Sequence, residues 1–246
     1  MSALAVAACG GDAPDASRRA DVVERANAEG AHRGPAPAGG SGTDASAARL
    51  DAAQDPRPRV VVLGDSLTAG LGLEPAEAYP TLLQQKLDAA GLDYRVVNAG
   101  VSGDTSAGGL SRLDLALEGD VRVLIVALGG NDALRALPPD SLRKNLSTIV
   151  ERAQADGATV LLAGMEAPPN FGQDYVEAFR AVYGDVARQY KVALLPFLLD
   201  GVAGIDGLNQ RDGIHPTAEG ARVIADRMWP VLEPLVRGDA RRAAHQ

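Results

Sequence analysis

Ser66 is the first residue whose type and position could support covalent chemistry. It follows an apolar run, Val60–Leu63, whose three β-branched residues predict a buried strand that breaks at Gly64. A serine at a sharp turn after a strand lies at the carboxyl edge of a sheet, where open α/β sheets bind ligands. Its hydroxyl could act as a nucleophile if a base reached it, but a serine in this place also commonly caps the next helix. The stretch alone leaves both interpretations open.

His215 is the imidazole base available to that serine, because it is the one histidine within residues 59–237, while His32 and His245 lie in the terminal segments. Asp212 precedes it by three residues. On a tight turn this spacing lets the carboxylate reach Nδ1 while Nε2 faces the serine, which is the arrangement of a nucleophilic triad. The alternative is a capping or core histidine beside an ordinary turn aspartate.

The elements that must position these groups alternate in type along residues 59–237. Strands are predicted over 60–63, 94–98, 121–128, 159–163 and 192–196. The third is apolar at nearly every position, which is typical of a strand buried on both faces in a parallel sheet. Alternation with amphipathic helices predicts an α/β fold, a parallel sheet with helices on both faces. The candidate groups would then meet at one edge of that sheet.

The predicted helices fill the intervals between these strands. The expected ranges are 74–90, 106–117, 139–156, a helix that includes 176–186, and one that starts at Pro216. Pro216 should occupy the first helical position of the last one, and Pro230 should kink or break it.

Composition excludes several classes of protein. The 246 residues carry a net charge of −8, which argues against nucleic-acid binding. The chain has no apolar run long enough to span a membrane, and its single cysteine, Cys9, excludes an intrachain disulfide. No metal-ligand cluster and no phosphate-cradling glycine loop of the P-loop type is recognisable, so no metal and no cofactor is expected. The chain is expected to act as a monomer.

The N-terminal residues 1–58 have the composition of a processed leader and a tether. Val6–Cys9 resembles a bacterial lipobox, in which the cysteine is lipidated, although no positive charge precedes the short apolar run. Either the true start lies upstream of Met1 or the likeness is chance, and we favour the first because the only cysteine lies there. Residues 10–58 are rich in Ala, Gly, Pro, Asp and Ser and predict a disordered tether; residues 238–246 predict a frayed tail.

Four sequence blocks together resemble the SGNH, or GDSL-type, hydrolases, in particular the bacterial thioesterase I, protease I, lysophospholipase and arylesterase group. The blocks are Gly64–Leu67, Asn98–Ser106, Gly129–Asp132 and Asp212–Pro216, and they occur in the family's order and spacing. The similarity covers residues 60–236. It implies a flavodoxin-like three-layer sandwich with a five-stranded parallel sheet, formed by residues 59–237.

The resemblance also implies roles for individual residues. Ser66 corresponds to the nucleophile, His215 to the general base and acid, and Asp212 to the residue that orients it. The backbone N–H groups of Ser66 and Gly103 and the side-chain amide of Asn131 would form an oxyanion hole. Chemistry agrees, because the oxyanion needs donors fixed in advance, glycine permits close backbone approach, and asparagine supplies N–H donors without a charge. Asp65 is expected to bind loop N–H groups and fix the turn.

An acyl groove is expected beside this site, lined by Leu134, Leu137, Pro169 and Phe171, although ordinary core packing is an equally good explanation for the leucines. The predicted activity is hydrolysis of acyl esters and thioesters through an acyl-serine intermediate. A carbohydrate O-deacetylase on the same scaffold and a non-catalytic surface module are the alternatives, since a fold does not fix the substrate. The lipobox predicts a periplasmic or otherwise extracytoplasmic protein, anchored to the membrane if Cys9 is lipidated.

Overall fold

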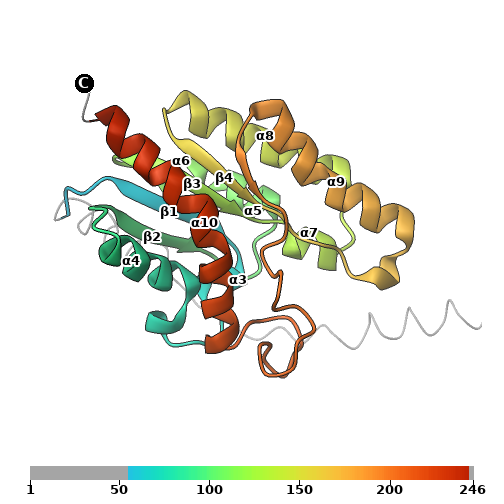
Figure 1. Cartoon of the computed structure of the whole chain (residues 1–246). Coiled ribbons are helices and arrows are strands. Elements are labelled where there is room, and N and C mark those ends of the chain that lie inside the picture. The colour runs from blue at the N-terminus through green and yellow to red at the C-terminus, as the bar shows by residue number, and fades with distance from the viewer. Residues whose placement is uncertain (1–54, 244–246) are drawn as a thin grey trace, which may run out of the picture. The chain divides into compact units, whose positions relative to one another are not determined.

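The computed structural model describes residues 55–243, which are built around a five-stranded parallel sheet (Figure 1). Its strands are β1 (Arg59–Gly64), β2 (Arg95–Gly100), β3 (Val121–Ala127), β4 (Thr159–Ala163) and β5 (Ala193–Leu195). They lie in the order β2-β1-β3-β4-β5, the order of flavodoxin-like doubly wound sheets. The predicted fold class is confirmed. The strand order reverses between β1 and β3, so the crevice at their carboxyl ends is where such a sheet binds ligands.

Helices cover both faces of the sheet. α4 and α10 pack together on one face, while α5, α8 and α9 pack together on the other (Figure 1). The α-helices are α3 (Ser66–Ala69), α4 (Tyr79–Ala89), α5 (Ser106–Ser111), α6 (Leu113–Ala116), α7 (Gly130–Leu134), α8 (Pro139–Ala155), α9 (Gln173–Tyr190) and α10 (Ala218–Ala243). Two short 3₁₀ helices, η1 (Pro75–Glu77) and η2 (Pro169–Phe171), precede α4 and α9.

The core is centred on the interior strands β1, β3 and β4. Val60–Leu63 of β1 and Val123–Val126 of β3 pair in parallel and are essentially inaccessible to solvent. Helix α8 adds Leu142, Leu146 and Ile149, all fully buried and spaced to share one face of the helix. Each such side chain contributes about 1.5–3 kcal/mol of transfer free energy. This packing fixes the strand ends from which the candidate site is built.

The folded part begins earlier than the expected boundary at residue 59. The backbone N–H of Arg95 donates to the carbonyl of Pro58 at 2.9 Å, which extends the contact between β2 and the chain before β1. The guanidinium of Arg57 pairs with Asp55 at 2.6 Å. The last residues of the predicted tether are therefore held against β2. Residues 1–54, including Cys9, lie outside the described part of the chain.

The C-terminal segment also differs from the prediction, because α10 continues through Ala243 where a frayed tail was expected from residue 238. The hydroxyl of Tyr94 donates to Asp239 at 2.8 Å, and Asp239 is buried. Pro230 does not break the helix, which changes direction along its length (Figure 1). Buried side chains on either side of Pro230, including Met228 and Leu232, hold the helix against the sheet and outweigh the missing backbone bond.

The start of α10 is likewise displaced from its predicted position at Pro216. Pro216 instead forms an isolated antiparallel bridge with Asn209, and the helix begins at Ala218. The hydroxyl of Thr217 accepts from the N–H of Gly220 at 3.3 Å and so acts as the cap. Among residues 55–243, no helix is long and apolar enough to cross a membrane.

Candidate active site

Ser66 is the first residue of the short helix α3, directly beyond the end of β1. The carboxylate of Asp65 accepts the backbone N–H of Leu67 at 3.0 Å and caps that helix, as expected. Gly64 is required at the turn, because a Cβ there would lie 1.9 Å from the hydroxyl oxygen of Thr68. The strand, the turn and the cap together hold the Ser66 hydroxyl at the carboxyl edge of the sheet.

The three residues proposed as a triad form one chain of hydrogen bonds. His215 Nε2 lies 2.9 Å from Ser66 Oγ, and His215 Nδ1 lies 2.6 Å from Asp212 Oδ2. The second carboxylate oxygen, Asp212 Oδ1, accepts the backbone N–H groups of Ile214 and His215 at 2.9 and 3.0 Å. These two bonds fix the carboxylate on the turn before α10, so that Nδ1 carries the proton and Nε2 is free to accept one from serine.

Asp212 remains ionised throughout the neutral range. The hydrogen bond from His215, followed by the backbone N–H groups of Ile214 and His215, lowers the pKa of Asp212 to about 2. A carboxylate that stays charged can stabilise an imidazolium as it forms.

Asp65 has the opposite electrostatic environment. Its side chain is almost completely buried, and this desolvation raises its pKa to about 6. The N–H of Leu67, the electrostatic interaction with His215 and the amide of Asn131 lower the pKa of Asp65 and keep the rise from being larger. Asp65 is therefore ionised at neutral pH, at a cost to folding stability.

The donors expected to form an oxyanion hole come from three different loops. The N–H of Ser66 is at the first position of α3, where helical geometry offers no acceptor. The N–H of Gly103 lies in the turn between β2 and α5, and Gly103 has a φ of +85° that favours glycine. Within residues 55–243, neither N–H has a hydrogen-bond acceptor, so both are available to a ligand.

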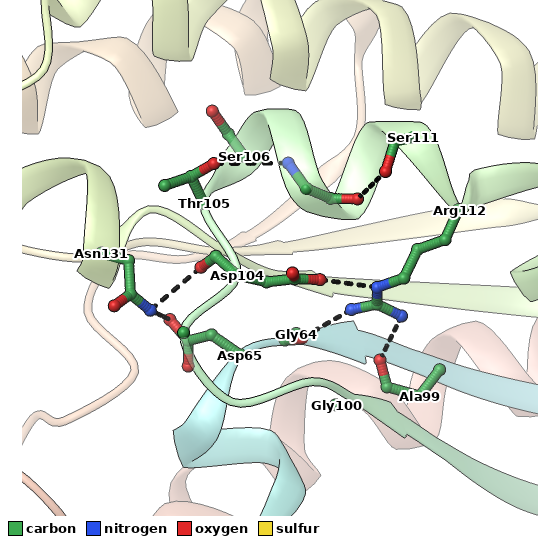
Figure 2. Close-up of polar contacts among 12 residues, drawn as sticks. Gly64, Asp65, Ala99, Gly100, Asp104, Thr105, Ser106, Ser111, Arg112 and Asn131 are labelled. Carbon is green, nitrogen blue, oxygen red and sulfur yellow. Dashed lines mark hydrogen bonds and ion pairs between the residues drawn. The ribbon is translucent and has the colours of Figure 1, made fainter. Parts of the chain in front are cut away.

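Asn131 lies at the start of α7, after β3, and its amide is shared. Nδ2 donates to the carbonyl oxygen of Asp104 at 2.9 Å and lies 3.5 Å from Asp65 Oδ2 (Figure 2). The first contact is a normal hydrogen bond and the second is at the limit of one. One N–H therefore ties the loop that carries Asp104, while the other is weakly held and could donate to an oxyanion.

A cavity of about 540 Å³ opens beside Ser66 and His215. Leu134 and Pro169 line it, as expected, whereas Leu137 and Phe171 do not. Phe171 instead contacts the ring of Tyr175 edge to face, and Leu137 is held through its carbonyl by the hydroxyl of Tyr175. The remaining lining is largely apolar and includes Met165, Ala167, Pro168, Phe197, Leu199, Ala203 and Ile214. Such a surface suits an acyl or aryl group.

Polar residues that the sequence interpretation did not single out hold these loops in place. Asp132 is buried and accepts the hydroxyl and backbone N–H of Ser106 at 2.5 and 2.7 Å, and Asn145 donates to the same hydroxyl. The guanidinium of Arg112 donates hydrogen bonds to the ends of β1 and β2 and to the loop between β2 and α5. Asp132 lies in the Gly129–Asp132 block with Asn131, and this position points to a role in the site. Nothing in the local sequence around Arg112 indicates such a role. Among residues 55–243, no group of His, Cys, Asp and Glu side chains is placed to hold a metal ion.

Comparison with known proteins identifies related chains. Residues 62–223 match the model of the GDSL-like lipase/acylhydrolase family. The chain is 49% identical to esterase TesA of Pseudomonas aeruginosa over 178 residues, which cover 72% of this chain and 89% of that protein. It is 40% identical to thioesterase 1/protease 1/lysophospholipase L1 of Escherichia coli over 182 residues, covering 74% and 86% of the two chains. A crystal structure of TesA superposes with a TM-score of 0.70 at 49% identity and covers 72% of this chain and 99% of that one.

Proposed function

The chain belongs to the GDSL-like lipase/acylhydrolase family, and on that premise we propose that it hydrolyses carboxylic esters and thioesters of acyl chains through an acyl-serine intermediate on Ser66. The single observation that carries this proposal is the continuous chain of hydrogen bonds from Asp212 through His215 to Ser66, with both links under 3 Å. Such a chain provides a nucleophile, a base and an orienting acid in hydrogen-bonding reach of one another.

In the first half of the reaction, Ser66 Oγ attacks the carbonyl carbon of the ester while His215 Nε2 takes its proton. Asp212 stabilises the imidazolium that results, and its low pKa keeps it from taking the proton itself. The carbonyl oxygen becomes an oxyanion, which the N–H groups of Ser66 and Gly103 and the amide of Asn131 would bind. When the tetrahedral intermediate collapses, the imidazolium protonates the departing alcohol or thiol.

In the second half, a water molecule attacks the acyl-serine. His215 accepts a proton from this water and returns it to Ser66 Oγ as the acyl group leaves as a carboxylic acid. The donors that stabilise the first oxyanion serve again for the second. The proposed cycle needs no metal ion or organic cofactor.

The apolar cavity supports an acyl or aryl ester as the substrate class. Leu134, Pro169 and Ile214 line the same cavity as Ser66 and offer hydrophobic contact to a chain extending from the carbonyl carbon. The relatives named esterase, thioesterase and lysophospholipase support the same class. A series of p-nitrophenyl esters from acetate to palmitate would define the chain length that this cavity accepts.

We further propose an extracytoplasmic location, on the basis of the lipobox-like residues that end at Cys9. Radiolabelled palmitate incorporation into wild-type protein and its loss in Cys9→Ala would support lipid anchoring. Absence of the label from the protein expressed from its native gene, with any residues that precede Met1, in a host that processes lipoproteins would refute lipid anchoring.

Substitution of Ser66 tests the enzymatic proposal. Ser66→Ala should lower kcat for p-nitrophenyl butyrate by about 10⁴-fold or more, because the remaining site can act only through binding and the oxyanion donors. Circular dichroism and the melting temperature should stay close to wild type. A variant that keeps more than a tenth of wild-type kcat would remove Ser66 from this role.

A further inference from the structure

We propose that Arg112 is a positioning residue that sets the geometry of the oxyanion hole, acting through Asp104. This inference rests on the proposed function, because it assigns Arg112 to the donors that would bind the oxyanion. It concerns residues 101–105, the loop between β2 and α5 that carries Gly103, named here the oxyanion loop.

Arg112 makes hydrogen bonds through all three guanidinium nitrogens (Figure 2). Nε donates to Asp104 Oδ2 at 2.6 Å, Nη1 to the carbonyl of Ala99 at 2.7 Å, and Nη2 to the carbonyl of Gly64 at 2.8 Å. The Arg112 and Asp104 side chains are only 20% and 18% exposed, so the charge pair is largely shielded from solvent. Short charge-assisted bonds in such a site are stronger than those of surface pairs.

The three acceptors belong to segments that must be held at fixed distances for the site to work. Gly64 ends β1, two residues before Ser66, and Ala99 lies near the end of β2, just before the oxyanion loop. Asp104 follows Gly103 directly. Because the guanidinium is planar and rigid, it fixes the separation between the segment carrying the Ser66 N–H and the loop carrying the Gly103 N–H.

Asp104 also connects Arg112 with the third expected donor. Its carbonyl oxygen accepts Asn131 Nδ2 at 2.9 Å, while its carboxylate is held by Arg112. The carboxylate lies close against Gly108, where an added Cβ would come within 2.6 Å of Asp104 Oδ1, so a side chain at residue 108 would displace it. All three expected oxyanion donors are thus linked through one residue of the oxyanion loop.

The position of Arg112 in the chain fits this role. The helix predicted from residue 106 through Leu117 is interrupted at Arg112, which separates α5 from α6. The residue adopts φ −113° and ψ 15°, outside the helical region, and its side chain reaches the strand ends instead of continuing along the helix surface. A residue that only stabilised the helix would not need this geometry.

The test compares Arg112→Lys and Asp104→Asn with the matched control Arg59→Lys. Arg59 lies at the opposite end of β1 and also donates from its guanidinium to a backbone carbonyl, that of Glu118, at 3.0 Å. Lysine keeps the charge but cannot bind three acceptors in the plane of a guanidinium. In both test variants kcat should fall about 10- to 100-fold with KM within about twofold, because the donors act mainly on the transition state. The control should retain wild-type kcat.

A transition-state mimic separates positioning from general stability. A p-nitrophenyl alkylphosphonate places a charged oxygen in the oxyanion hole when it reacts with serine, so its second-order inactivation rate should fall in parallel with kcat. The inhibition constant of the product carboxylic acid should change by less than about twofold. Combining Arg112→Lys with Asn131→Ala should cost less than the product of the single effects, because both act through the same loop.

Two results would overturn the inference. One is a lowered melting temperature in Arg112→Lys and Asp104→Asn with kcat unchanged when each is assayed well below its own melting temperature. The other is a rise in KM that accounts for the whole loss of kcat/KM. Either result would leave Ser66 as the nucleophile, whereas full activity in Ser66→Ala would refute the proposed function itself. If Arg112→Lys does not fold, Asp104→Asn, which keeps the backbone carbonyl and the side-chain shape, decides the question.

Discussion

Replacing Asp65 with asparagine should stabilise the protein at neutral pH and leave its stability in acid nearly unchanged. Asp65 is 2% exposed, and burial raises its pKa from 3.8 to about 6. The native state therefore holds this proton more tightly than the unfolded chain does. Well below the unfolded pKa of 3.8 the group is protonated in both states and contributes no penalty. As the pH rises from that value towards the folded pKa of about 6, the free energy of unfolding decreases, and above the folded pKa it stays constant.

The size of the expected stabilisation follows from how far burial raises the pKa of Asp65. A pKa difference of one corresponds to about 1.4 kcal/mol. Raising the pKa of Asp65 by about two therefore lowers the free energy of unfolding by about 3 kcal/mol where Asp65 is ionised in both the folded and the unfolded state. Asparagine is nearly isosteric, and its carbonyl oxygen can still accept the N–H of Leu67 that Asp65 caps at 3.0 Å. The variant should therefore remove the penalty while keeping the cap.

Urea unfolding at a series of pH values between about 4 and 8 measures this effect. The difference in unfolding free energy between Asp65→Asn and wild type should rise across about pH 4 to 6 and reach a plateau of about 3 kcal/mol. Carboxylates common to both proteins cancel in this difference. Asp93→Asn, at a site whose side chain is 87% exposed, serves as the control and should give a flat difference. A flat or falling difference for Asp65→Asn would refute the argument from burial.

The remaining predictions concern the site, the cavity and the N-terminal segment. Asn131→Ala should lower kcat by about 10²–10³-fold with little change in KM, and kinetics showing near-normal kcat would leave the backbone N–H groups as the only oxyanion donors. Asp212→Asn should lower kcat by about 10⁴-fold with an unchanged melting temperature, because the imidazole loses its orientation; a small effect would remove Asp212 from the triad. Leu134→Ser should raise KM for octanoate esters more than for acetate, while Leu137→Ser, outside the cavity, should not alter that ratio. Deletion of residues 1–54 should leave kcat and melting temperature unchanged, and loss of folding would mean that this segment docks.

The parts of the fold that sequence predicts are those encoded by local patterns. Short apolar runs predict the five strands, since a strand buried on both faces needs apolar residues at consecutive positions. The proposed triad is predictable from the sequence because its residues stand near predicted strand ends and helix starts. His215 is also the only histidine in residues 59–237, which left a single partner for Ser66.

Other features depend on contacts between distant segments and gave no local signal. The last turns of α10 are stabilised by the bond between Tyr94 and Asp239, which are 145 residues apart. Arg112 looks like an ordinary polar helix residue until its three acceptors are brought together by the sheet. The cavity also depends on tertiary packing, which is why Leu134 reaches it and Leu137, three residues later, does not.

Covalent labelling by an alkyl fluorophosphonate, followed by peptide mapping, tests most directly whether Ser66 is the nucleophile. The serine nucleophile displaces fluoride, so we expect one adduct per chain, on the peptide that contains Ser66, and none in Ser66→Ala. Labelling of His215→Ala should be slowed strongly because the base that takes the serine proton is gone. An adduct on another serine, with Ser66 unmodified and esterase activity lost, would show that Ser66 is not the nucleophile.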